Sequence, residues 1–99
     1  MTVDTRVERD RMYVIIKGRL DTTTASDLEM VLKEGLNGIK ELIFDFGALE
    51  YIYSAGLRVL LSAHKVVKQQ GGKTIVRRAN EEVREVFFIT GFSDIMEVE

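Results

Sequence analysis

The sequence predicts one α/β domain built on a mixed, mostly parallel sheet of about five strands, with helices packed on it. Its 99 residues match the size of a single domain, expected to span residues 1–99. Apolar residues recur first at strand spacing and then at helical spacing, in the order strand, strand, helix, strand, helix, strand, helix, strand. Strands that alternate with helices form parallel sheets through right-handed crossovers.

The first two strands are predicted to form an antiparallel hairpin. Val3, Thr5 and Val7 alternate with charged residues, which is typical of a half-exposed strand. Residues 9–10 make a polar break, and residues 12–16 predict a more buried second strand.

Capping residues precede the first predicted helix. Asp21 is followed by three threonines, and Thr24 with Asp27 has the spacing of a capping box. The apolar face of this helix comprises Ala25, Leu28, Val31, Leu32 and Leu36. Gly38 is the predicted stop.

The next strand is predicted at residues 42–46, where the run is apolar and aromatic-rich. A short polar turn then leads to Ser54, which the spacing predicts as the N-cap of a helix reaching about Gln70. Gly71 and Gly72 close that helix.

The last part of the chain predicts a strand, a helix and a short final strand. Residues 74–76 are β-branched and predict the strand, and Asn80 is placed to cap the helix. Gly91 ends the helix, and residues 95–98 predict the last strand.

Three polar residues stand at predicted strand-to-helix junctions: Asp21, Ser54 and Asn80. The carboxyl ends of parallel strands meet at one edge of a sheet, where α/β proteins carry their functional surface. We therefore expect these residues on one rim of the molecule.

Composition excludes several classes of site. The chain has no cysteine and one histidine, so neither a disulfide framework nor a zinc site is expected, and no metal or cofactor is predicted. The net charge of −2, without a basic stripe, argues against nucleic-acid binding. No apolar run approaches the roughly 20 residues that insert into a bilayer. The first residues lack the pattern of a signal peptide, which predicts a cytoplasmic protein.

Ser54 has three candidate roles on these grounds: a structural N-cap, a phosphorylation site or a nucleophile. A nucleophile needs a base within hydrogen-bond reach. The only histidine, His64, lies ten residues further along the same predicted helix, about 15 Å away along its axis. The hydrolase interpretation therefore fails, and we predict that the protein is not an enzyme.

The chain resembles the STAS domain in its stand-alone bacterial form, the anti-sigma factor antagonist or anti-anti-sigma factor. The resemblance spans nearly all 99 residues. It depends on Gly18-Arg19-Leu20-Asp21 with Thr24-Ala25, on Leu42-Ile43-Phe44-Asp45-Phe46 leading into Tyr53-Ser54-Ala55-Gly56-Leu57, and on Ile89-Thr90-Gly91-Phe92. Family members usually carry Asp or Ser before the motif serine, where this chain has Tyr53.

This resemblance implies that Ser54 is phosphorylated by a serine kinase that is also the anti-sigma factor. The unphosphorylated protein would bind that partner and free a sigma factor, and the phosphorylated protein would release it. A serine phosphatase would reverse the modification. The implied partner-binding residues are Asp21, Thr24, Tyr53, Ser54, Ala55, Gly56 and Arg58.

Two other functions remain open from the sequence. Related domains also serve as soluble subunits of membrane transport complexes, where a permanent partner would make phosphorylation irrelevant. A small-ligand or nucleotide sensor is the second, because helix N-termini on the rim could hold an anion. The chain lacks a glycine-rich phosphate loop, since Gly71-Gly72 follows a helix rather than opening one.

Overall fold

The computed structural model describes residues 2–99; Met1, part of the predicted domain, lies outside them. The strands are β1 (Thr2–Glu8), β2 (Arg11–Leu20), β3 (Glu41–Ile52), β4 (Lys73–Arg77) and β5 (Glu97–Val98). The helices are α1 (Thr22–Gly35), α2 (Ser54–Gln69), α3 (Glu81–Thr90) and a short 3₁₀ helix, η1 (Phe92–Asp94).

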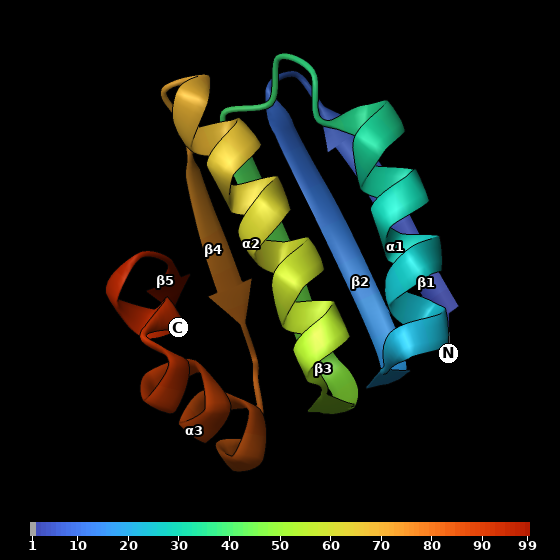
Figure 1. The fold of residues 1–99 in the computed structure, drawn as a ribbon. Helices are drawn as coiled ribbons and strands as arrows, with labels where there is room; N and C mark the ends of the chain where they lie inside the picture. Colours follow the sequence, from blue (N-terminus) through green and yellow to red (C-terminus); the bar gives the residue numbers. More distant parts are fainter. Residues whose placement is uncertain (1) are drawn as a thin grey trace.

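The five strands form one sheet in the order β1-β2-β3-β4-β5 (Figure 1). β1 pairs antiparallel with β2, and every other neighbouring pair is parallel. Each parallel step is made through a helix, as the alternation of elements predicts. The predicted fold class and the order of the elements are confirmed.

All three α-helices contribute to the apolar core on one face of the sheet. α1 and α2 lie side by side in front of the strands in Figure 1. The ring of Phe87 on α3 meets Phe46 of β3 edge to face, with centroids 6.2 Å apart. The side chains that are fully buried include Met12, Val14, Leu28, Phe44, Leu60 and Phe87.

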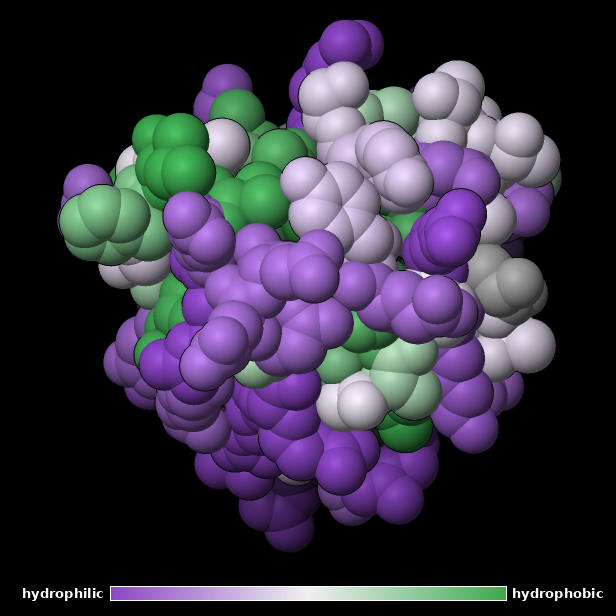
Figure 2. Space-filling model, turned by 90° about the horizontal axis from the view of Figure 1, so that it is seen from below, coloured by the Kyte–Doolittle hydropathy of each residue, from purple (hydrophilic) through white to green (hydrophobic). Residues whose placement is uncertain are grey.

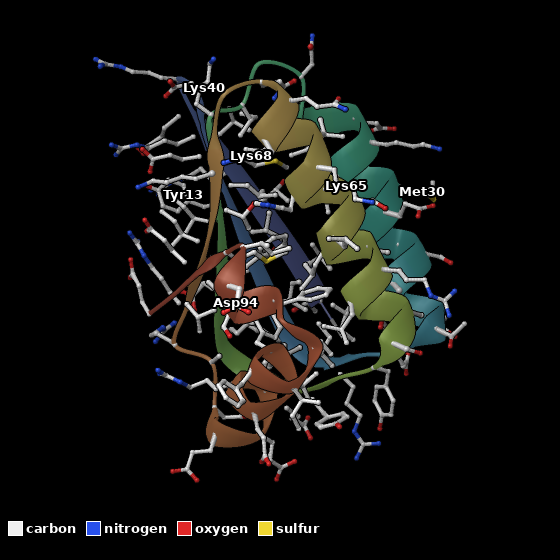
Figure 3. The ribbon with its side chains drawn as sticks, turned by 60° about the vertical axis from the view of Figure 1, so that its left-hand side comes forward. Tyr13, Met30, Lys40, Lys65, Lys68 and Asp94 are labelled. Carbon is white, nitrogen blue, oxygen red and sulfur yellow. The ribbon has the colours of Figure 1, made fainter. Side chains whose placement is uncertain are left out.

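Within residues 2–99 no helix covers the opposite face of the sheet, which carries charged side chains instead. Tyr13 points away from the helices on this side (Figure 3). Ile43 and Ile75 are nevertheless buried there. They lie among long side chains that form surface ion pairs, namely Arg11–Glu41 at 3.6 Å, Lys73–Glu97 at 3.5 Å and Arg77–Glu99 at 3.3 Å. Each such pair contributes little stability by itself, but side chains of this length can shield neighbouring apolar residues from water with their aliphatic stems.

The boundaries of α1 differ from the prediction. Asp21 is the N-cap and Thr24 is the third helical residue, so the capping box is Asp21–Thr24 and the predicted Thr24–Asp27 box is wrong. The helix ends at Gly35 with Leu36 as its C-cap. Gly38 lies in the following turn, where its φ of 81° is one that glycine adopts without strain.

β3 is much longer than predicted. The sequence gives residues 47–50 the small and polar character of a turn, but they continue the strand to Ile52. The predicted end at Phe46 is therefore wrong. The final strand is shorter than predicted, because the N–H groups of Ile95 and Met96 bond back to the Phe92 carbonyl in a turn and β5 begins only at Glu97.

Candidate functional site

Three helices begin at one edge of the molecule, which we call the helix-start edge: the first residues of α1, α2 and α3 with the residues just before them. The Tyr53 N–H donates to the Leu20 carbonyl at 2.9 Å, which joins the start of α2 to the end of β2. The Asn80 side chain donates to the carbonyls of Leu49 and Glu50, which joins the start of α3 to β3. The predicted grouping of Asp21, Ser54 and Asn80 is confirmed.

Figure 2 looks at this edge from below. Hydrophobic and weakly polar surface occupies much of its upper part, and hydrophilic surface covers its lower part. A mixed surface of this kind suits protein recognition better than an enclosed small-molecule site, because a protein partner needs apolar contact area with a polar surround.

Ser54 is exposed and is the first residue of α2, not its N-cap. The N-cap is Tyr53, in an extended conformation and without a side-chain hydrogen bond to the helix. The predicted N-cap role of Ser54 is wrong, because β3 reaches Ile52 and only one residue is left to join strand and helix. Among the hydrogen bonds of residues 2–99, none uses the Ser54 hydroxyl.

The start of α2 keeps backbone donors available. The first helical bond runs from the Leu57 N–H to the Tyr53 carbonyl at 3.0 Å. The N–H groups of Ser54, Ala55 and Gly56 come before it and have no partner within the helix ladder. Such groups, together with the positive end of the helix dipole, favour an anion close to the Ser54 hydroxyl.

The start of α1 is closed by its own side chains. Thr24 N–H donates to Asp21 Oδ1 at 3.1 Å, and Asp21 N–H donates to Thr24 Oγ1 at 2.8 Å. The Thr24 hydroxyl also donates to the Arg19 carbonyl at 2.9 Å. The hydrogen bonds from the Thr24 backbone and side chain hold the pKa of Asp21 below its usual value. Asp21 thus adds a negative charge to the edge, beside the Leu20 carbonyl that binds Tyr53.

Tyr53 and Tyr51 form an aromatic pair next to Ser54. Their rings meet edge to face with centroids 5.1 Å apart, and Tyr53 is 42% exposed. Tyr53 is one of the binding residues predicted from the sequence, whereas Tyr51 is not among them. The signal was present, since two tyrosines at strand spacing lie on the same face of an extended chain.

The other predicted binding residues divide by burial. Arg58 is exposed, and Ala55 is half-buried. Gly56 is buried, and a Cβ placed on it would lie 2.6 Å from Leu20 Cγ. Gly56 therefore serves the close approach of α2 to β2 and is not a surface contact.

His64 is buried on α2, and its Nδ1 lies 2.9 Å from the Thr74 hydroxyl of β4. Burial lowers the pKa of His64, so the ring favours its neutral form. With this partner in the core, His64 ties α2 to the sheet.

Within residues 2–99, no cluster of three or more His, Cys, Asp or Glu side chains is arranged to hold a metal ion. No helix in that range has the length and apolar character needed to cross a membrane.

Comparisons with known proteins agree with the resemblance inferred from the motifs. The family model of the STAS domain matches residues 2–99. The chain is 37% identical to BtrV of Bordetella bronchiseptica, named as a candidate anti-sigma factor antagonist, over 88% of this chain and 76% of the other. It is 30% identical to the anti-sigma-B factor antagonist of Bacillus subtilis, over 99% of this chain and 90% of that protein.

A solved structure has the same fold. SpoIIAA of Bacillus in its phosphorylated form superposes with a TM-score of 0.80 at 19% identity, covering 99% of this chain and 91% of that one. The agreement at so low an identity shows that the fold is shared.

Proposed function

Because the chain belongs to the STAS domain family, we propose that it is an anti-sigma factor antagonist controlled by phosphorylation of Ser54. The observation that carries the proposal is the exposed Ser54 hydroxyl, free of internal hydrogen bonds, at a helix start without a side-chain cap. The relatives that are named anti-sigma factor antagonists support the proposal that the partner is an anti-sigma factor.

In the unphosphorylated state, the helix-start edge binds an anti-sigma factor that is also a serine kinase, and a sigma factor is released. Tyr53 supplies an aromatic contact of the type that dominates interface energetics. Asp21 and Arg58 supply charges of opposite sign, which orient the partner. The Thr24 hydroxyl supports Asp21 from within the same capping box.

Phosphorylation adds about −1.5 to −2 charges at the start of α2. The protein itself tolerates this charge, because the free N–H groups of α2 point toward it and the dipole favours it. Arg58 lies one turn further along the same helical face and can pair with the phosphate. We therefore expect the fold to stay as it is.

The change acts on the interface instead. A docked partner would have to desolvate the phosphate, and any carboxylate of the partner that faces Ser54 would repel it. Losing one complementary contact and gaining one repulsive contact costs about 3 kcal/mol, or roughly a hundredfold in affinity. A serine phosphatase would restore binding. In this scheme the protein is a non-enzymatic switch that works in the cytoplasm.

The test compares Ser54→Asp with Ser62→Asp, an equal charge on an exposed serine of the same helix. Against the anti-sigma factor that co-purifies with the native protein, we expect Ser54→Asp to weaken binding about a hundredfold and Ser62→Asp to leave it unchanged. Melting temperatures should stay within about 4 °C of the original. Equal affinity of the two variants would contradict the proposal.

A second experiment identifies the residue that is phosphorylated. Incubated with the captured kinase and radiolabelled ATP, the original protein should take up label and Ser54→Ala should not. Label on the alanine variant would move the modification to another residue, with Ser62, Ser93 and Tyr53 as the first to examine.

A further inference from the structure

The C-terminal part of β3, which leads to Ser54 at the helix-start edge, lacks a neighbouring strand on one side. β3 pairs with β4 only as far as Asp45 opposite Arg77. On the other side its pairing with β2 continues to Ile52 opposite Leu20. Seven residues of β3 therefore run beyond β4 toward Ser54 with a ladder on one side only.

The first part of this segment contains a bulge. Where β2 advances from Ile15 to Lys17, β3 advances from Asp45 to Ala48, which is one residue more. Bulges of this kind leave a residue unpaired and bend the strand.

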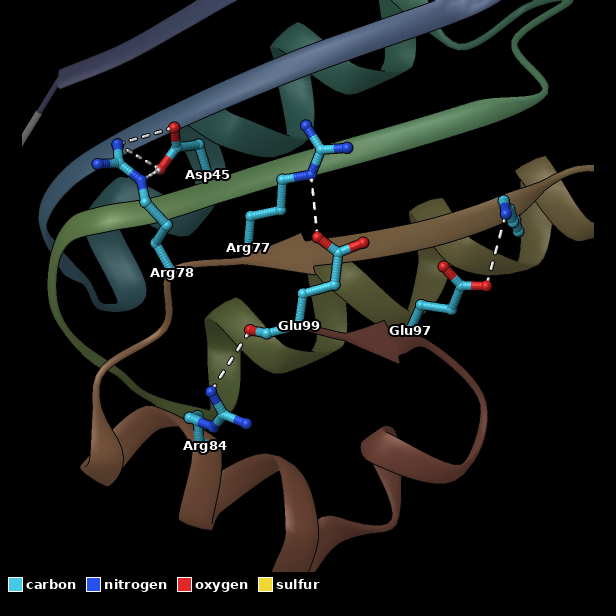
Figure 4. A network of polar contacts seen from close by, with 7 residues as sticks. Asp45, Arg77, Arg78, Arg84, Glu97 and Glu99 are labelled. Atoms are coloured by element: carbon cyan, nitrogen blue, oxygen red, sulfur yellow. Dashed lines mark hydrogen bonds and ion pairs between the residues drawn. The ribbon is translucent and has the colours of Figure 1, made fainter.

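Asp45 and Arg78 hold this first bulge. Asp45 Oδ1 accepts the Gly47 N–H at 3.0 Å. The Arg78 guanidinium donates to both oxygens of the same carboxylate, at 3.0 and 2.9 Å (Figure 4). A Cβ on Gly47 would lie 2.5 Å from Arg78 Cζ, so the guanidinium lies directly against the strand. Arg78 does this with a φ of 59°, a conformation that costs energy for a residue other than glycine.

A second bulge follows. Where β2 advances by one residue, from Gly18 to Arg19, β3 advances by two, from Leu49 to Tyr51, and Glu50 is left out of the pairing.

Asn80 holds this second bulge. Its Nδ2 donates to the carbonyls of Leu49 at 3.2 Å and Glu50 at 3.1 Å. Its Oδ1 accepts the Val83 N–H at 2.9 Å and so caps α3 at the same time. The Asn80 side chain thus donates hydrogen bonds to β3 where β4 no longer pairs with it, and the same side chain caps α3.

We infer that Arg78 and Asn80 are positioning residues that fix the register of β3 and hence the place of Ser54. Both come from the three-residue connection between β4 and α3. A strand that slips by one residue turns each side chain to the other face, and bulges held in place pin the register against such a slip. The idea that a kinase partner requires this register of β3 rests on the proposed function. The positioning of Ser54 by Arg78 and Asn80 is a property of this chain alone.

The first test replaces Asn80 so that its hydrogen bonds to β3 are lost while its cap on α3 is kept. Asn80→Asp keeps an oxygen that can cap α3, but it loses the amide donors and faces two carbonyls with a charge. The readout is amide hydrogen exchange at Tyr53, whose N–H donates to Leu20. We expect exchange there to become at least about tenfold faster, with exchange unchanged at Val76, which is buried in β4 between β3 and β5.

Arg78→Lys is the second variant, because it keeps the charge and loses the two-pronged contact with Asp45. Ile75→Val is the matched control: it removes one methyl group from the open face of the sheet, away from the edge. It should leave exchange at Tyr53 unchanged. Unchanged exchange in both Asn80→Asp and Arg78→Lys would overturn the inference. An equal acceleration at Tyr53 and Val76 would also overturn it, since that result means general destabilisation.

Phosphorylation by the captured kinase supplies the functional arm. Asn80→Asp should be phosphorylated at least about tenfold more slowly than Ile75→Val at equal concentration. Equal rates would show that the register does not govern the kinase's access to Ser54 and would contradict its use by the partner. Absence of label on the original protein would contradict the proposed function alone, because the exchange experiment decides the positioning without any partner.

Discussion

The starts of α1 and α3 differ from the start of α2. Asp21 and Thr24 cap α1 reciprocally, and Asn80 caps α3 through its carbonyl oxygen. α2 begins after Tyr53 with no side-chain cap. A capped start uses its donors internally, whereas an uncapped start keeps them for a ligand or a modification. The difference indicates that side-chain caps fix the starts of α1 and α3, whereas the start of α2, where we propose the phosphorylation site, keeps its backbone donors available.

The start of α2 is held by other means. The backbone N–H of Tyr53 binds the Leu20 carbonyl, and the buried Gly56 lets the first turn of the helix approach the same residue. Packing therefore replaces the cap as the force that fixes this terminus. Substitutions at the packing contact, at the uncapped N-cap position and at the serine itself test how the start of α2 is held.

The largest effect is expected at the packing contact. A Cβ on Gly56 would lie 2.6 Å from Leu20 Cγ and 3.1 Å from its carbonyl oxygen, so Gly56→Ala overpacks the junction. Overpacking outweighs the better helix propensity of alanine, and we expect a net loss of about 2 kcal/mol of unfolding free energy. Urea denaturation measures it, with Ser62→Ala on the exposed side of α2 as the control. A Gly56→Ala protein as stable as the original would mean that packing does not hold this terminus.

The next effect has the opposite sign. Tyr53→Asp supplies the missing cap, because a carboxylate at this position accepts N–H groups of the first turn. Relative to Tyr53→Ala, which also removes the ring, it should gain about 1 kcal/mol of unfolding free energy. The gain should shrink once Ser54 is phosphorylated, because both anions then compete for the same donors. Equal stability of the two variants would mean that the donors of α2 are already satisfied.

Periodicity predicted the fold well, because alternating burial in strands and apolar faces in helices are local properties of the chain. The cap at Asn80 and the stop at Gly91 were also predictable, since each acts within one helix turn. The sheet edge with Asp21, Ser54 and Asn80 followed from topology alone.

The extension of β3 was not predictable. Gly47 and the polar residues near it indicate a turn when taken alone, and they become strand only because Arg78 and Asn80 replace the absent ladder. Those partners lie about 30 residues further along the chain, beyond the reach of local patterns. The N-cap error at Ser54 has the same origin, because the cap position depends on where the strand ends.

The smallest effect is expected at Ser54 itself. Since its hydroxyl caps nothing, Ser54→Ala should change the unfolding free energy by no more than about 0.5 kcal/mol. Asn80→Ala is the comparison, because it removes a real cap and should cost about 1 kcal/mol or more. Parallel urea titrations of the two alanine variants decide the point. If Ser54→Ala lost as much as Asn80→Ala, the hydroxyl would be stabilising α2, and phosphorylation would then have to break a structural contact. If the unfolding free energy of Ser54→Ala equals that of the original protein, the serine at the start of α2 can carry a charge at no cost to the fold.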